Sequence, residues 1–188
     1  MRTPINEALL RHFRDLRDGT HGQAVSRDDK EQVFITAVGL LDPVARTALD
    51  ELNADLLLGA GEVVASGVTR SREGGLNAMW SLTWQEQRAC HAQPVAVVAH
   101  YGSDFHHPHL RGNTVGDWPL NVFDEADAAA QLDTLRVIAA GDAHNLVFQE
   151  SYRLMPALTR EEPGQESLTL RCTTRVKRIG NGEASETA

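Results

Sequence analysis

The first part of the chain carries apolar residues at helical spacing. Four of them recur every three or four positions: Ile5, Leu9, Phe13 and Leu16. This spacing predicts a helix that ends at Gly19. Ser26 can cap a second helix. The pair Asp42 and Pro43 predicts that a third helix starts there, because Asp caps well and Pro fits the first helical position. We therefore expect residues 1–58 to be helical.

From residue 62 onward, the pattern changes to alternation with a period of two, which is typical of half-buried strands. Residues 64–70 and 76–86 alternate in this way and flank a turn that contains Gly74 and Gly75. A β-hairpin is the expected structure. Residues 94–101 form a continuous apolar run, which suits a strand buried on both faces.

The segment after this run has no clear period. Residues 103–122 contain several Gly and Pro and predict a long irregular loop, and loops of that length are often functional. Asp124 can cap the helix that follows. This helix is expected to end near Ala140, because Gly141 and Asp142 come next and interrupt the pattern.

Two later segments, residues 146–154 and 168–176, alternate again and are predicted to be strands. Helices followed by strands favour an α+β fold: a mainly antiparallel sheet of about five strands, packed against the N-terminal helices and one later helix. We expect a single domain over residues 1–179, in which residues 62–178 hold the sheet and the later helix. The tail, residues 180–188, is rich in Gly, Glu, Ser and Thr and is expected to be disordered.

The composition argues against several partners. With 188 residues and 41% apolar content, the chain can bury a substantial core. Its net charge is −8, from 18 basic and 26 acidic residues. This balance argues against nucleic acid, because affinity for a phosphate backbone depends on Lys and Arg. No glycine pattern fits a dinucleotide or phosphate loop, so no nucleotide cofactor is expected.

The two cysteines, Cys90 and Cys172, do not indicate a disulfide framework. The N-terminal residues do not resemble a signal peptide, and no apolar run approaches the roughly 18 residues of a membrane span. A cytoplasmic protein without a membrane partner is the expectation.

The histidines are distributed unevenly. Four of the eight stand within ten residues: His100, His106, His107 and His109. Imidazole binds transition metals and titrates near neutral pH, so this segment is the leading candidate site.

A metal site can be built from this segment. In an extended chain, His107 and His109 point the same way and His106 points the opposite way. If the chain folds back at Gly102, His100 can join His107 and His109 around one ion. Three nitrogen ligands with an open fourth position suit a catalytic zinc or a non-haem iron.

Neighbouring residues could complete an active site. Asp104 could hold an imidazole or supply an oxygen ligand, and His106 or Asp104 could move a proton. Arg111 could orient an anionic substrate through paired hydrogen bonds. The resulting hypothesis is a metal-dependent hydrolase or lyase that acts on a small polar or anionic molecule. His144 is a candidate fourth ligand.

Other interpretations stay open at this point. The histidines could serve as acid and base in a metal-free pocket, titrate in a pH-sensitive fold, or be purely structural. The alternative of another class is a non-catalytic binding or accessory module, whose histidine loop contacts a partner or carries a metal. The remaining histidines near the N-terminus, His12 and His21, are expected to be exposed to solvent.

Overall fold

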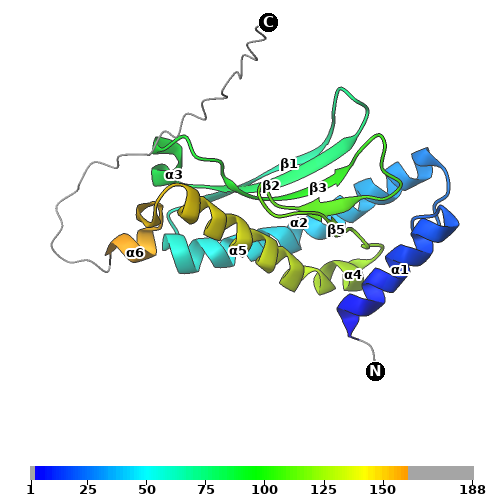
Figure 1. The fold of residues 1–188 in the computed structure, drawn as a ribbon, viewed down its shortest axis with the longest axis horizontal. Helices are drawn as coiled ribbons and strands as arrows, with labels where there is room; N and C mark the ends of the chain where they lie inside the picture. The colour runs from blue at the N-terminus through cyan, green and yellow to red at the C-terminus, as the bar shows by residue number, and fades with distance from the viewer. Residues whose placement is uncertain (1–2, 161–188) are drawn as a thin grey trace, which may run out of the picture.

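A computed structural model describes residues 3–160 of the chain. The chain forms a layer of helices under one face of a five-stranded sheet (Figure 1). The strands follow one another in space in their chain order, and every neighbouring pair is antiparallel. They are β1 (Glu62–Arg70), β2 (Leu76–Thr83), β3 (Val95–Tyr101), β4 (His109–Arg111) and β5 (Trp118–Pro119). The predicted α+β class is confirmed.

The helices differ greatly in length. They are α1 (Pro4–Asp18), α2 (Arg27–Leu57), α3 (Gln85–Ala89), α4 (Glu125–Ala130), α5 (Leu132–Gln149) and α6 (Pro156–Arg160), with a 3-10 turn, η1 (Tyr152–Leu154), before α6. The two long helices, α2 and α5, pack against each other and against the sheet (Figure 1). This contact forms the core.

The strand faces that meet the helices are apolar and fully buried. Register partners on β2 and β3 supply them: Ala78, Trp80 and Leu82 opposite Ala99, Val97 and Val95. The buried indole of Trp80 donates to Asp42 Oδ1 over 2.8 Å, and that of Trp84 donates to the Leu154 carbonyl over 2.7 Å. Both indole N–H groups are therefore paired, as a buried Trp requires.

The predicted break at Pro43 is wrong, because α2 continues through it. Proline inside a helix removes one hydrogen bond and costs about 3 kcal/mol. Buried residues lie on both sides of it, among them Phe34, Leu41, Leu49 and Leu52. Packing of both halves on the same core holds the helix in line and offsets that cost.

The predicted helix end at Gly141 and Asp142 is also wrong, and so is the strand expected at 146–154. Helix α5 runs through both residues to Gln149. A side chain at Gly141 would meet Val115 at 2.8 Å, so this glycine allows a close approach of the loop. The buried Asp142 carboxylate accepts hydrogen bonds from that loop and does not compete for the helix backbone. Tertiary contacts therefore explain why Gly141 and Asp142 lie within a helix.

The hairpin β1–β2 and the buried strand β3 are confirmed. The second hairpin strand ends at Thr83, and α3 follows it. The loop expected at 103–122 contains two short strands, β4 and β5, which extend the sheet beside β3. The strand predicted at 168–176, Cys172 and the tail lie outside the described residues. Cys90, at the end of α3, is not a free thiol.

Among the described helices, α2 alone is long and apolar enough to cross a membrane by length and composition. A core helix can pass the same test. In this structure one face of α2 packs on the sheet and α5.

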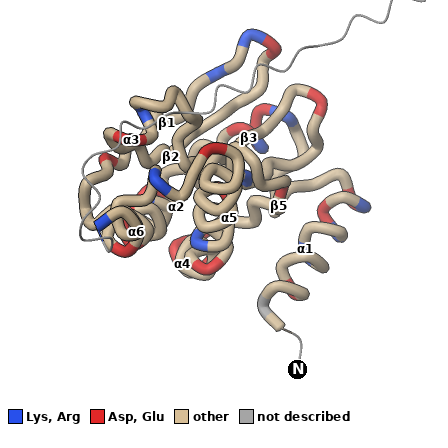
Figure 2. The backbone as a smooth tube through the Cα atoms, turned by 60° about the vertical axis from the view of Figure 1, so that its left-hand side comes forward, with Lys and Arg blue, Asp and Glu red and all other residues tan. Residues whose placement is uncertain are grey.

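Helix α1 stands beside the two layers and does not cover either (Figures 1 and 2). An apolar stripe normally faces the core. In α1, however, Ile5, Phe13 and Leu16 are 62%, 56% and 48% exposed, while His12 and Asp15 are buried. The helix therefore meets the domain through a polar edge.

Candidate functional site

The turn after α1 directs His21 inward. Asp15 accepts hydrogen bonds from Thr20 Oγ1 and from the Gly22 amide, both at 3.0 Å. Gly22 has a φ of +61°, and a Cβ there would lie 2.4 Å from the Phe123 ring, so only glycine fits. The His21 side chain is left with no exposed surface.

The loop that carries His106 and His107 is held by two cations from α2. The Arg27 guanidinium stacks 3.6 Å from the Tyr101 ring centroid and donates to the Gly102 carbonyl over 2.9 Å. Lys30 Nζ donates to the Gly19 carbonyl over 2.8 Å and to the His106 carbonyl over 3.5 Å. Lys30 thus links the end of α1 to the histidine loop.

Five imidazoles from these segments form a continuous row. Ring centroids lie 5.9 Å apart for His21 and His107, 5.0 Å for His107 and His12, 5.9 Å for His12 and His109, and 5.7 Å for His109 and His100. His100 and His109 are register partners on β3 and β4. We call these residues, in the order His21, His107, His12, His109 and His100, the histidine row.

Most ring nitrogens of the row are buried without a partner. His12, His21 and His107 are 7%, 0% and 1% exposed. Six buried ring nitrogens accept or donate no hydrogen bond within the described residues: His12 Nδ1, His21 Nδ1 and Nε2, His107 Nδ1 and Nε2, and His109 Nδ1. Each such group costs about 1–3 kcal/mol of desolvation. Native proteins hold only a few such groups per hundred residues, and six of them gather here.

Burial favours the neutral form of four of the five imidazoles in the row. Burial lowers the pKa of His21 to about 4, and the neighbouring His107 adds to the effect. Burial likewise lowers the pKa of His107 to about 4, helped by His12 and Lys30. The pKa values of His12 and His109 are also lowered by burial. Each neutral imidazole keeps one lone pair that can bind a ligand.

The far end of the row is different, because His100 has a carboxylate partner. Its Nε2 lies 2.7 Å from Asp117 Oδ1, and the Asp117 side chain is about half exposed. A carboxylate on one nitrogen fixes the orientation of the ring. Asp117, from the loop between β4 and β5, thus has the role that the sequence assigned to Asp104.

The predicted metal ligands come together only in part. His107 and His109 both contact His12, while His100 contacts His109. As the side chains stand, no group of three or more His, Cys, Asp or Glu within residues 3–160 has the arrangement of a metal site.

The predicted catalytic residues are not among the contacts of the row. His106, Asp104 and Arg111 are exposed. Asp104 accepts a hydrogen bond from its neighbour Ser103 over 3.2 Å. The opposite directions expected for His106 and His107 agree with their burial, since one is exposed and the other buried.

The expectation that His12 and His21 are exposed is wrong. His12 is buried because its edge of α1 is the one that meets the loop. A signal was present in the sequence: Asp15 stands three residues after His12, and two glycines, Gly19 and Gly22, follow in a tight turn.

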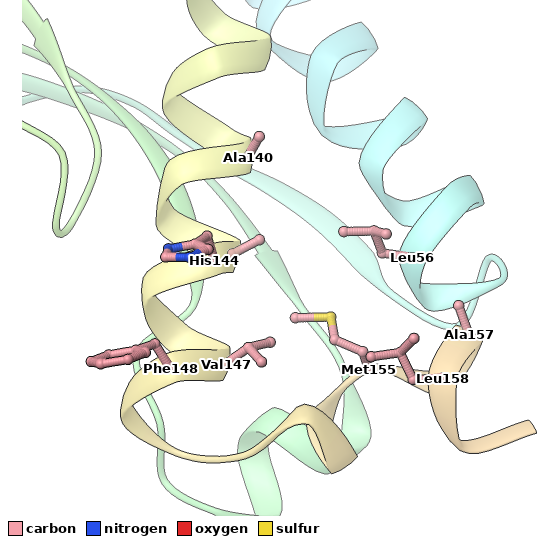
Figure 3. Close-up of a pocket in the computed structure, with 9 residues that line it drawn as sticks. Leu56, Ala140, His144, Val147, Phe148, Met155, Ala157 and Leu158 are labelled. Carbon is pink, nitrogen blue, oxygen red and sulfur yellow. The ribbon is translucent and has the colours of Figure 1, made fainter. Parts of the chain in front are cut away.

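A separate hollow of about 400 Å³ lies between α5, the end of α2 and α6 (Figure 3). Leu56, Val147, Met155 and Leu158 supply much of its apolar lining. His144, the candidate fourth ligand, borders this hollow and stacks on Phe148. Of the residues that the sequence predicted for the site, only His144 is among those lining this hollow.

No known protein family, curated protein or solved structure matches this chain. The histidine row has to be interpreted from its own geometry.

Proposed function

We propose that this protein binds a divalent transition-metal ion through the histidine row, with His12, His21 and His107 as the main ligands. The observation that carries the proposal is the set of six buried ring nitrogens without a partner within the described residues. A bound ion gives one nitrogen of each of the three ligands the partner that the protein itself does not provide, and so removes the desolvation cost of three of the six nitrogens.

The spacing of the rings supports one shared ion. Two imidazoles that bind a tetrahedral ion through nitrogens about 2.0–2.1 Å from the metal have ring centroids about 5 Å apart. The centroids of His12 and His107 are 5.0 Å apart, and those of His107 and His21 are 5.9 Å apart. Binding of one ion by all three residues requires rotation of the rings and an approach of His12 and His21 toward each other.

The donor set indicates the class of metal. Neutral imidazole nitrogens suit zinc, copper, nickel, cobalt or ferrous iron, whereas calcium and magnesium require oxygen ligands. Lys30 is a nearby positive charge, but burial lowers its pKa. The Asp15 carboxylate opposes that charge. Its negative charge partly counteracts the lowering of the pKa of His21 and His107 by burial.

Burial favours a non-catalytic, metal-carrying or accessory module over an enzyme. A catalytic ion needs an open coordination position for water and substrate, and the three main ligands are at most 7% exposed. An enzyme, the second candidate, is favoured by one observation. His100 held by Asp117 has the arrangement of a general base, and it stands at the end of the row where its partner carboxylate is about half exposed.

Metal analysis of untagged protein tests the proposal. We expect roughly one zinc, copper, nickel or iron ion per chain after purification, and visible absorption of a tetrahedral site when metal-free protein is titrated with Co²⁺. His107→Ala should weaken Co²⁺ binding by about 100-fold. The matched control is His144→Ala, which changes an exposed histidine on α5 and should bind normally. Wild-type protein that takes up no more Co²⁺ than His107→Ala overturns the proposal.

A further inference from the structure

The attachment of α1 to the domain depends on few contacts. It shares no extensive packing interface with another described helix or strand. Outside the histidine row, the Ala8 carbonyl accepts a hydrogen bond from Asn121 over 3.0 Å. Arg11 pairs with Asp127 at 3.3 Å and stacks 4.1 Å from the Phe123 ring centroid. Partly exposed ion pairs of this kind contribute little.

Apolar burial contributes only in part to holding α1 in place, because Leu9 and Leu10 are only partly buried. Two further apolar residues of α1, Phe13 and Leu16, are about half exposed. His12 is instead the side chain of α1 that reaches furthest into the domain, where its ring contacts both His107 and His109. Without a ligand, this contact buries unpaired nitrogen, which opposes docking.

The two ends of α1 are held differently. The C-terminal end is anchored, because Lys30 Nζ donates to the Gly19 carbonyl over 2.8 Å. Gly19 and Gly22 both have positive φ values and form the turn that follows. The rest of α1 leads away from this turn and stands apart from the two layers (Figure 2).

We infer that metal binding controls the docking of α1, so that the histidine row acts as a clasp between the N-terminal helix and the sheet. This inference rests on the proposed metal site. The ligands come from two sides: His12 and His21 belong to α1 and its turn, and His107 belongs to the loop between β3 and β4. An ion that binds all three is bound only when α1 is docked, and therefore shifts the chain toward the docked state.

Hydrogen–deuterium exchange of the full chain, with and without Zn²⁺, tests the clasp. At free Zn²⁺ about 100 times its dissociation constant, exchange in residues 5–18 should slow by up to about 100-fold. Residues 71–75, the turn between β1 and β2, exchange through local opening and are the internal reference, so they should exchange at the same rate in both samples. In His12→Ala, exchange of residues 5–18 should no longer respond to Zn²⁺. Phe13→Ala, a neighbouring change on the exposed side of α1, should retain the response.

The outcomes separate this inference from the proposed function. If Co²⁺ absorption shows that the metal binds, but residues 5–18 exchange equally fast with and without Zn²⁺, the clasp is refuted and the metal site stands. If Co²⁺ does not bind, both are refuted. Equal protection by Zn²⁺ in wild type and His12→Ala also refutes the clasp, because the α1 ligand would then be irrelevant.

Discussion

Two buried polar centres in this protein differ in how their hydrogen-bonding groups are used. Asp142, on α5, is 3% exposed and accepts hydrogen bonds from the amides of Ala96, Asn113 and Thr114 and from the Thr114 hydroxyl, over 2.7–3.2 Å. Four of the five residues of the histidine row are also buried, yet six ring nitrogens of the row have no partner within the described residues. A buried group whose bonds are all made inside the protein is structural, whereas a buried cluster without partners points to a ligand.

Removal of the Asp142 carboxylate should have the largest effect on stability. Asp142→Ala leaves three backbone amides without an acceptor, so we expect the free energy of unfolding to fall by about 3–5 kcal/mol. Urea denaturation measures this change. Asp133→Ala is the control on the same helix; its side chain is 90% exposed, and its loss should stay within about 0.5 kcal/mol. Equal losses in both variants would show that Asp142 is not structural.

Metal bound at the histidine row should stabilise the folded protein by slightly less than the Asp142 carboxylate does. At free Zn²⁺ about 100 times the dissociation constant, the free energy of unfolding should rise by about 2.7 kcal/mol, because the ion binds the folded state. Thermal unfolding with and without Zn²⁺ measures the gain. Asp142→Ala should show the same gain, since that carboxylate is not part of the row. No change in wild type would contradict the metal site.

Acid should weaken the metal-free protein. The unfolded chain protonates its histidines near pH 6.5, whereas His21 and His107 resist protonation in the folded state until about pH 4. The unfolded state therefore holds more protons between these values. The contribution of these two histidines to stability is complete above pH 6.5 and declines as the pH falls toward 4. The charged and titratable groups that affect them are Asp15, Lys30, His12 and His109.

Urea denaturation of metal-free protein at pH 7 and pH 4.5 checks this dependence. The His107→Leu variant should lose part of the slope. A profile of equal slope in wild type and variant would show that the acid sensitivity lies elsewhere.

Replacement of a row histidine by an apolar residue should have the smallest effect on stability, and it should not destabilise the protein. His107→Leu removes two unpaired buried nitrogens at similar volume, so metal-free protein should be as stable as wild type or more stable by about 1 kcal/mol. The same variant should lose metal binding. A loss of stability as large as that of Asp142→Ala would mean that His107 has partners inside the protein, and would remove the contrast.

Elements defined by their own pattern were predicted well. The hairpin and the strand at 95–101 follow from alternation and from a continuous apolar run, and Asp124 caps α4 as expected, accepting from the Asp127 amide over 2.8 Å. The errors at Pro43 and Gly141 have a common cause. Each residue disfavours a helix locally, and each lies where packing against another element holds the helix together.

The candidate site was predicted only in part. The sequence drew attention to the loop that carries His106 and His107, and the shared direction of His107 and His109 agrees with their common contact with His12. Asp117 was not foreseen as the partner of His100, because seventeen positions separate them and only the pairing of β4 with β5 brings that loop close.

By itself the sequence determined the α+β class, the buried central strand and the density of imidazole around residue 107, since these depend on composition and local periodicity. Tertiary structure decided that a polar edge of α1 faces the domain and brings His12 and His21 to that loop. Contacts between residues almost a hundred positions apart depend on how turns and layers place them, and local pattern carries no record of that placement.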